Sequence, residues 1–461
     1  MDKNEISEIV LNTEGTNMKV RHDAKNEAPD LKMRPTQEEL NALFAPETSA
    51  KTPSNKIDNH LNKVHLLKDP AVSALLNGDT VVINSLSEYI DLVLKYEKLV
   101  DANKDRGLPF SGAPLYRGEY GHFENRVSGA FRHGGDEAGN LFPSHIPAMQ
   151  EFYNTLAFRL TNLELSQFDT FAHHHGLNTN MLDVTSSPLF ALFMACYRYD
   201  MSKPKEDNGY VYIFHNHMDV TGFYNNNTFP YTTIVEALIQ NDAQTIKTMM
   251  STLENFYLKM PDLENGRSRQ FTNYMQVLCS NIAQLIDMDS RIVGYSDDLA
   301  TTYQHEVLGQ NPNDATLSNL VDRINDYEIE LPVKKPEKLD KDGGYTIKYL
   351  VYAYVVCLVY YLRNAQGTSS EPFMPLMVYN PKITFEQARA QKSSSIIQPY
   401  KDAGTLDDTI MLLSDVKHMA TIKINGVKEL LRDLSLMNVT KSSFFEDYDN
   451  IAITIKDKYG R

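Results

Sequence analysis

Polar residues of the kinds that bind or activate ligands are concentrated between positions 115 and 217. Arg117 lies between an aromatic residue and Gly118, in a segment, 115–119, that we expect to be a short strand. An arginine there can present a bidentate fork to a phosphate or a carboxylate, and a glycine beside it lets a ligand approach the backbone closely. Pairing of Arg117 with a carboxylate in the core accounts for the same residues, so both interpretations stay open.

Three consecutive histidines, His173 to His175, follow a helical pattern and precede Gly176. Glycine is favoured just past the end of a helix, and the helix dipole stabilises a protonated histidine there. The histidines could therefore be simple caps. Because successive helical residues point about 100° apart, all three cannot bind one metal ion.

The next candidate residues, Asp183 and Thr185, fall in an expected loop before a helix that has Ser187 as N-cap and Pro188 as its first residue. The unpaired backbone N–H groups of such a helix start point at the loop and form a ready site for an anion. The alternative is that Asp183 only braces the turn, since a capped helix start requires no ligand.

A predicted strand at 209–214 ends in His215 and His217. Residues two apart on a strand share a face, so these histidines, together with His173 and His175, could form the metal site of a hydrolase. We expect no metal, because the ligands would have to converge from two segments. The phosphate-binding loop, the dinucleotide-binding glycine motif and the serine-hydrolase elbow are absent from the sequence.

Composition and periodicity divide the chain into four segments. Residues 1–60 are rich in Asn, Lys, Glu, Pro and Thr, which predicts a mobile N-terminal tail, with one short amphipathic helix at 35–44. Residues 61–225 open with a strand and a helix and form the first part of the folded body. Two helical apolar stripes make 226–345 a helical insertion, and 346–461 form the second part of the body.

The 461-residue chain carries a formal net charge of −15, which should repel duplex nucleic acid and anionic lipid headgroups. Its three cysteines lack the spacing of a disulfide or zinc framework, and its first residues lack the pattern of a signal peptide. The longest apolar run, 349–362, is shorter than the roughly 20 residues of a membrane-spanning helix. We therefore expect a soluble cytoplasmic protein, with neither duplex nucleic acid nor a membrane among its partners.

Together these motifs resemble the FRG domain, a family named for a Phe/Tyr-Arg-Gly motif. The residues that carry the resemblance are Leu115-Tyr116-Arg117-Gly118-Glu119, Ser128-Gly129-Ala130-Phe131-Arg132 and the run from Ala172 to Thr185, followed by Ser187-Pro188. The resemblance resumes at 389–391 and 427–449, and so covers roughly 80–225 and 370–461. Gln391 begins the segment Gln-Lys-Ser-Ser-Ser, where family members have a Gln-x-Gly-x-Phe pattern.

The resemblance implies an α+β fold, a mixed sheet with flanking helices and a helical insertion. A Tyr-Arg-Gly strand is also similar to the opening motif of ADP-ribosyltransferases, in which the arginine orients NAD. That chemistry needs an arginine for the phosphates, an aromatic ring for the nicotinamide and a polar or acidic group near the ribose. The resemblance assigns catalysis to Arg117, His175, Asp183 and Gln391, and NAD binding to Tyr116, Arg117, Gly118, Thr179 and Thr185.

Two main hypotheses about function follow. The first is an NAD-using, ADP-ribosyltransferase-like effector that modifies a macromolecule, in the setting of a bacterial toxin or of anti-phage defence. NAD is then a substrate, and no metal is needed. The second is a non-catalytic FRG-domain binding or sensor module, which meets a protein partner through the N-terminal tail or the helical insertion.

Overall fold

The computed structural model describes residues 69–101, 113–123, 126–131, 146–197, 208–224, 233–260, 263–264, 267–288, 316–327, 329–341, 344–365, 373–381, 390–402, 410–412, 416 and 418–445. Every element below belongs to one compact unit, Asp58–Arg461. The predicted N-terminal tail and its short helix lie outside the described residues.

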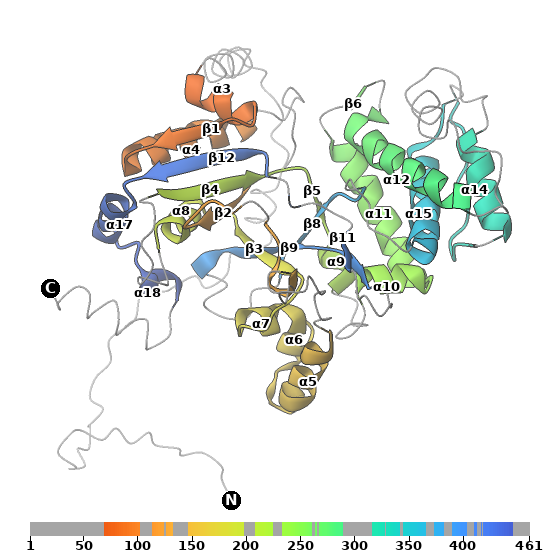
Figure 1. The fold of residues 1–461 in the computed structure, drawn as a ribbon, viewed down its shortest axis with the longest axis horizontal. Helices are drawn as coiled ribbons and strands as arrows, with labels where there is room; N and C mark the ends of the chain where they lie inside the picture. Colours follow the sequence, from red (N-terminus) through yellow and green to blue (C-terminus); the bar gives the residue numbers. More distant parts are fainter. Residues whose placement is uncertain are drawn as a thin grey trace, which may run out of the picture. The chain divides into compact units, whose positions relative to one another are not determined.

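A mixed sheet, eight-stranded within the described residues, is the centre of the fold (Figure 1). From edge to edge its strands are β1 (Thr80–Ile83), β12 (Ala420–Asn425), β4 (Asn208–Phe214), β2 (Leu115–Glu119), β3 (Met181–Thr185), β9 (Ser393–Ile397), β8 (Leu376–Tyr379) and β5 (His217–Asp219). The edge pairs β1 with β12 and β5 with β8 are parallel, and the inner pairs are antiparallel. Two short ribbons lie outside this sheet: β6 (Leu263–Glu264) with β7 (Arg267–Ser268), and β10 (Tyr400–Asp402) with β11 (Ile410–Leu412).

The sheet is weakly joined at its middle, between β2 and β3. In the described strands, the ladder between them consists of one residue pair, Tyr116 with Thr185, whereas β2 pairs with β4 along its whole length. On its other side β3 pairs with β9 over all five of its residues. Side chains must therefore supply part of what holds β2 beside β3.

Helices cover one face of the half of the sheet that contains β1, β12, β4 and β2. The hydrophobic core between these helices and this half of the sheet contains residues of α3 (Pro70–Leu76), α4 (Leu86–Asp101), α8 (Pro188–Cys196), α17 (Val427–Leu436) and α18 (Lys441–Phe444). From the sheet, Val211 and Ile213 of β4 join this core, while Tyr212 and Phe214 belong to a second cluster with residues of β3, β8 and β9. Because successive strand residues point to opposite faces, β4 is buried on both.

A layer of helices packs around α15 (Ile347–Asn364), which follows the predicted boundary at residue 345 (Figure 1). The helices are α10 (Ile234–Ile239), α11 (Ala243–Lys259), α12 (Arg269–Met288) and α14 (Thr316–Tyr327), and the two predicted apolar stripes fall on α11 and α12. Thr346 caps the start of α15, and every residue from Tyr349 to Leu362 is buried. The short helix α9 (Thr221–Tyr224) and strand β5 contact α11, which joins this layer to the sheet.

A smaller group of helices precedes β3. It comprises α5 (Ile146–Leu156), the 3₁₀ turn η3 (Ala157–Arg159), α6 (Asn162–Leu165) and α7 (Phe168–His174), and a further 3₁₀ turn, η2 (Gly129–Phe131), contacts β3. The helical pattern before the histidines is thus divided between two helices. Thr161 and Glu164 form a capping box that starts α6, and Gly176 ends the group with φ +87°.

The α+β prediction is confirmed, as are the strands at 115–119 and 209–214 and the helix that begins at Pro188. The expected loop around Asp183 and Thr185 was wrong, because these residues belong to β3. A strand forms there because the polar residues alternate with buried Leu182 and Val184, and β9 supplies a partner. Among the described helices, none is long and apolar enough to cross a membrane.

Candidate functional site

A cavity of about 360 Å³ lies over the face of β3 that carries Asp183 and Thr185. The lining residues come from β2, η2, the end of α7 and the loop after it, β3, α8, the start of β9 with the turn before it, and the residue after α18. They are Tyr116, Arg117, Gly118, Gly129, His173, His174, Gly176, Leu177, Asn178, Met181, Leu182, Asp183, Val184, Thr185, Phe190, Ala191, Met194, Gln391, Ser393 and Phe445. Small-molecule pockets span roughly 300–1,000 Å³. The cavity therefore fits a small ligand, or one part of a larger one.

Asp183 is held by a relay of side chains that starts at Thr179. His173 Nε2 lies 2.9 Å from Asp183 Oδ1, and His173 Nδ1 lies 2.8 Å from Thr179 Oγ1. Thr179 Oγ1 also accepts a hydrogen bond from the backbone N–H of Met181, at 3.3 Å. Since that bond uses the hydroxyl as an acceptor, its proton can be donated to Nδ1, and His173 then donates to Asp183 from Nε2. The relay fixes the orientation of the carboxylate.

The surroundings of Asp183 keep it ionised. Burial by the cavity walls opposes ionisation, but the charge and hydrogen bond of His173, with smaller effects of His174 and Arg117, hold the pKa of the carboxyl well below its usual range. Its side chain is 48 % exposed, because it faces the open cavity. Burial lowers the pKa of His174, so this imidazole is neutral at neutral pH. The cavity thus contains an ionised carboxylate, with His173 and Arg117 beside it.

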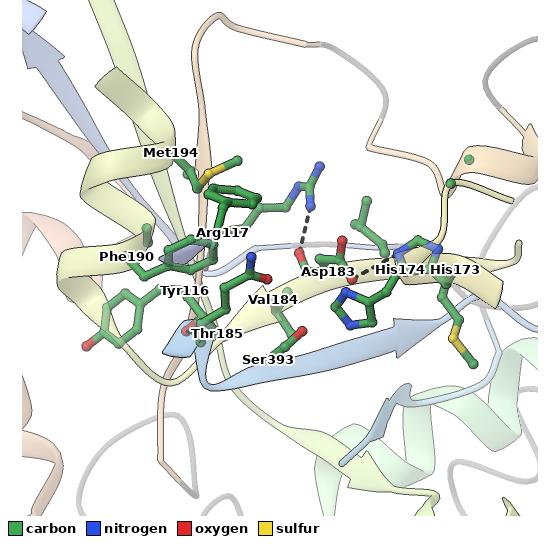
Figure 2. Close-up of a pocket in the computed structure, with 18 of the residues that line it drawn as sticks. Tyr116, Arg117, His173, His174, Asp183, Val184, Thr185, Phe190, Met194 and Ser393 are labelled. Carbon is green, nitrogen blue, oxygen red and sulfur yellow. Dashed lines mark hydrogen bonds and ion pairs between the residues drawn. The ribbon is translucent and has the colours of Figure 1, made fainter. Parts of the chain in front are cut away.

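Arg117 joins β2 to β3 across the weak point of the sheet. Its Nε donates to Glu119 Oε1 at 2.7 Å, and its Nη1 donates to the backbone oxygen of Asp183 at 2.6 Å. Figure 2 shows the guanidinium reaching across to Asp183. Beyond the one ladder pair, this side-chain bond takes the place of a main-chain bond between the two strands. The pairing of Arg117 with a buried carboxylate is therefore observed, and its binding of a ligand stays a prediction.

Glu119 links Arg117 to a second arginine behind the cavity. The Glu119 side chain is 7 % exposed, and Arg126 Nε lies 3.6 Å from its Oε2. The Arg126 guanidinium also lies 3.4 Å from the centre of the Tyr212 ring and contacts His418 Nδ1 at 3.1 Å. Two arginines thus share one buried carboxylate, which explains how Arg117 can be largely buried.

Aromatic rings form the end of the cavity opposite Asp183 (Figure 2). Tyr116 is fully buried, and its hydroxyl donates to Glu97 Oε1 of α4 at 2.6 Å, so its polar end is already bonded. Burial, with the bond to Glu97, raises the pKa of Tyr116. Phe190 lies beside it, with its ring 4.8 Å from that of Phe444. This end of the cavity is therefore apolar, although the ring of Tyr116 itself is not exposed.

Gly118 lines the cavity, but the space that a side chain would need is filled by α8. A Cβ there would lie 1.8 Å from the backbone oxygen of Ala191 and 2.7 Å from the backbone nitrogen of Ala195. Glycine at this position therefore lets the helix pack directly on β2. The expected close approach of a ligand at Gly118 stays a prediction.

Thr185 and Gln391 organise the turn at the start of α8. Thr185 Oγ1 accepts from the backbone N–H of Ser187 at 2.8 Å and donates to the backbone oxygen of Gln391 at 2.6 Å. The side-chain amide of Gln391 donates to the backbone oxygen of Phe444 at 3.2 Å. Ser187 Oγ in turn accepts from Phe190 N at 3.3 Å, which caps the helix. The helix start that was expected to bind an anion is thus partly satisfied within the protein.

Of the predicted residues, the cavity brings together Tyr116, Arg117, Gly118, Asp183, Thr185 and Gln391. Thr179 does not line it but contacts His173, which does. His175 is exposed outside it, with its ring 4.3 Å from that of Phe171. The structure therefore separates His175 from the residues with which it was grouped.

Two residues of the site were not predicted for it: Glu119 and Phe190. The pairing of Glu119 with Arg117 has a sequence signal, because residues two apart on a strand share a face. The contact between His173 and Asp183 has no such sequence signal, because it depends on how α7 docks beside β3.

Two of the histidines considered for a metal site, His215 and His217, do not line the cavity. His215 contacts Tyr96 Oη at 3.0 Å, and His217 lies on β5. Within the described residues, no group of three or more His, Cys, Asp or Glu side chains could hold a metal ion.

Comparison with known proteins gives one match. Residues 115–204 match the family model of the FRG domain, a shorter span than the 80–225 and 370–461 of the sequence resemblance. No curated protein and no solved structure matches the chain. The matched segment contains β2, α7, β3 and α8, so it carries the Tyr-Arg-Gly strand, the His173 to Asp183 relay and most of the cavity wall. The chain therefore contains an FRG domain, and the cavity is built mainly from that domain.

Proposed function

We propose that this FRG domain is an ADP-ribosyltransferase-like enzyme, which takes NAD into the cavity and transfers ADP-ribose to a macromolecule. The observation that carries the proposal is Asp183, an ionised carboxylate fixed by His173 and open to the cavity, opposite a wall of aromatic rings. The FRG resemblance suggests the setting of a toxin or of anti-phage defence. His175 has no role in the proposal, since it lies outside the cavity.

The chemistry fits a carboxylate that stays ionised. The bond between ribose C1′ and the nicotinamide nitrogen breaks, and nicotinamide leaves with the bonding electron pair. Positive charge develops on the ribose, and a fixed negative charge nearby stabilises it. The acceptor then bonds to C1′ and loses its proton. Because a low pKa makes Asp183 a weak base, we assign to it charge stabilisation and not proton abstraction.

Arg117 receives a supporting role in addition to the one that the resemblance implied. Its Nε and Nη1 are bonded to Glu119 and to the backbone of Asp183, and its remaining N–H groups are the donors that it can offer to phosphates. Arg117→Ala would leave the buried Glu119 without this partner, and removal of one partner of a buried ion pair costs about 3–5 kcal/mol. Loss of activity in that variant would not separate catalysis from folding.

The test uses Asp183→Asn, which keeps the shape of the side chain. Purified protein is incubated with NAD labelled in its adenylate half and with cell lysate, and both nicotinamide release and transferred label are followed. We expect activity in the wild type, a loss of roughly 10²-fold in Asp183→Asn, and no change in Asp91→Asn. Asp91 is a matched control, since its carboxylate is 63 % exposed on α4. Inactive wild-type protein with a cooperative thermal transition would contradict the proposal.

A non-catalytic binding module is the second candidate, and the bonded state of Arg117 favours it. A site whose arginine already has partners within the protein can serve the fold alone. The proposed contacts to a protein partner are then the N-terminal tail, 1–60, or the helical insertion, 226–345. Capture of the partner in a pull-down should be lost on deletion of 1–60 if the tail makes the contact, and retained capture would contradict that part.

A further inference from the structure

We infer that helix α7 responds to pH: it packs against the sheet while Asp169 is protonated, and it loosens as Asp169 ionises, which weakens the contact of His173 with Asp183. Asp169 lies in the first turn of α7, and His173 lies in its last turn, at the cavity. A change of charge at one end of this short helix would thus alter the cavity at the other. The inference concerns the shape of the site and does not depend on the proposed reaction.

Asp169 and His173 lie on one face of α7. They are four residues apart, and residues four apart are neighbours on the surface of a helix. His173 Nε2 lies 2.9 Å from Asp183 Oδ1 on β3 (Figure 2). Asp169 is near the phenols of Tyr224 in α9 and Tyr379 in β8, whose rings are 4.5 Å apart. A movement of α7 away from these phenols therefore also moves His173.

Polar side chains make much of the contact between α7 and the sheet. The buried apolar residues of α7, Phe168 and Ala172, belong to a small core shared with α5, separate from the cores that contain residues of the strands. Thr170 is also buried, and it lies beside Tyr379. Because little apolar packing fixes α7 to the sheet, its docking is sensitive to the charge of Asp169.

The surroundings of Asp169 disfavour a carboxylate. Its titratable neighbours are the phenols of Tyr224 and Tyr379, with Tyr400 of β10 next to Tyr224, and phenols are uncharged at neutral pH. Within the described residues, no cation and no hydrogen-bond donor contacts Asp169. Burial raises its pKa to about 7.

The other charged groups of the elements around α7 do not compensate for this. Glu164 of α6 is bonded to Thr161, and Glu151 of α5 is exposed. Both are acids, so neither can stabilise a second negative charge. On α7 itself, His173 faces Asp183.

The docked position causes the raised pKa of Asp169, and the helix does not. In the first turn of a helix, the dipole favours a negative charge. In an undocked α7 the carboxyl would meet water, where its pKa would be roughly 3.9. The docked state therefore binds the proton more tightly, so docking is strongest at low pH. It weakens as the pH rises from about 4 to 7, and it changes little above that range.

The test is hydrogen exchange of the full chain, followed by mass spectrometry at pH 6 and pH 8, with exchange times scaled to the intrinsic amide rate. In the wild type we expect the protection of 168–175 to fall about tenfold from pH 6 to pH 8. Protection of α11, 243–259, should stay constant, because it reports on the helical layer away from α7.

Asp169→Asn isolates the part of Asp169 in this effect. The histidines of α7 are a second source of pH dependence, since histidine changes charge between pH 5 and 8, and they are the same in both proteins. We expect Asp169→Asn to keep α7 protected at both pH values. Asp91→Asn, which changes an exposed acid of α4, should show the wild-type fall.

The link to the cavity is tested with Asp183→Asn, which removes the charge that His173 contacts. We expect α7 to exchange faster in this variant than in the wild type at pH 6. Unchanged exchange would show that α7 is not held through Asp183, and would overturn the inference.

Three further results would overturn it. They are equal protection of α7 in the wild type at the two pH values, a fall of the same size in α11, and an equal fall in Asp169→Asn. The wild-type comparison needs no variant, so the inference stays testable even if a variant fails to fold. No measurement here uses NAD, so failure of the proposed function would leave this result standing.

Discussion

Asp183 combines two properties that are usually found apart, because its carboxylate is both fixed and open. His173 Nε2 holds one oxygen at 2.9 Å, yet 48 % of the side chain is exposed. An unsupported surface carboxylate would be mobile and screened, and a fully buried one would need a close partner to stay charged. A charge held in place before a ligand arrives needs little reorganisation when positive charge develops nearby.

Asp183 should make the stability of the protein depend on pH in the acid range. Its folded-state pKa is lowered, so as the pH falls the unfolded chain binds the proton first. The stabilisation is fully present above the unfolded value, roughly 3.9, and is lost as the pH falls below it. We expect wild type to exceed Asp183→Asn in free energy of unfolding at pH 7, with the difference shrinking towards pH 3. Chemical denaturation at both pH values measures this, and a constant difference would contradict it.

Thr179→Val should disrupt the relay without removing a charge. Thr179 is buried, and its hydroxyl serves both His173 Nδ1 and the backbone N–H of Met181. Loss of a buried hydrogen-bond partner costs about 1–3 kcal/mol, so we expect a loss of stability of that size together with weaker ligand binding. Thr155→Val is the control, because Thr155 bonds only to Glu151 O on the exposed side of α5. An equal effect of both substitutions in urea denaturation would argue against the relay.

At the scale of elements, the position of α8 depends on two glycines beneath it. A Cβ at Gly118 would lie 1.8 Å from the backbone oxygen of Ala191, and one at Gly209 would lie 2.4 Å from that of Ala195. The helix therefore packs on the backbones of β2 and β4, and its capped start lies at the cavity. The Tyr-Arg-Gly sequence thus has a packing reason for its glycine, independent of any ligand.

Gly118→Ala should therefore destabilise the fold. The clashing atoms are backbone, so α8 must shift, and overpacking of a core costs typically about 1–3 kcal/mol or more. Gly222→Ala is the matched control, since the nearest atom to its added Cβ is Thr248 Cγ2 at 3.7 Å, and we expect a change below about 1 kcal/mol. Thermal unfolding of both variants measures the effect. A neutral Gly118→Ala would show that α8 is not held as closely as described.

The sequence predicted those elements whose cap residues or hydrophobic alternation lie within the element itself. Ser187 and Pro188 mark the start of α8, and the alternating residues of 209–214 mark β4. Strand β3 was missed because it lies directly before the strong start signal of α8, and its partner β9 comes much later in the chain. The residue types alone indicated which side chains could line a cavity. The bond between His173 and Asp183 could not be predicted, because it depends on how α7 docks beside β3.

Helix α7, which positions His173, also carries Asp169 in an environment that disfavours an ionised carboxylate. Burial raises the pKa of Asp169 to about 7, and the phenols of Tyr224 and Tyr379 are among its neighbours. In the unfolded chain the Asp169 carboxyl has a pKa of roughly 3.9. Because the folded-state pKa is higher, Asp169 increasingly destabilises the folded state as the pH rises from about 4 to 7. We expect Asp169→Asn to raise the free energy of unfolding at pH 7.5, on the order of 1–3 kcal/mol, and to leave it unchanged at pH 4. Chemical denaturation of wild type and Asp169→Asn at both pH values measures this difference. No gain in the free energy of unfolding at pH 7.5 would contradict the raised pKa of Asp169.

At the scale of the whole molecule, the sheet is assembled from strands that are far apart in the sequence. β1 pairs with β12, and β5 pairs with β8, so early and late parts of the chain lie side by side at both edges (Figure 1). Helix α15 packs with α11, α12 and α14, although it follows the predicted domain boundary. The segment that matches the FRG family therefore lies within a larger cooperative structure.

This arrangement predicts that the matched segment, 115–204, will not fold when it is expressed alone. Of its strands, β2 pairs mainly with β4 and β3 pairs mainly with β9, and both partners lie outside the segment. β2 and β3 themselves share one residue pair, and two strands alone are marginal in water. We expect no cooperative thermal transition by circular dichroism for 115–204, and a cooperative one for 58–461, which contains a whole compact unit. A cooperative transition in the short fragment would show that the cavity can form without β4 and β9, and the site would then have to be rebuilt from the matched segment alone.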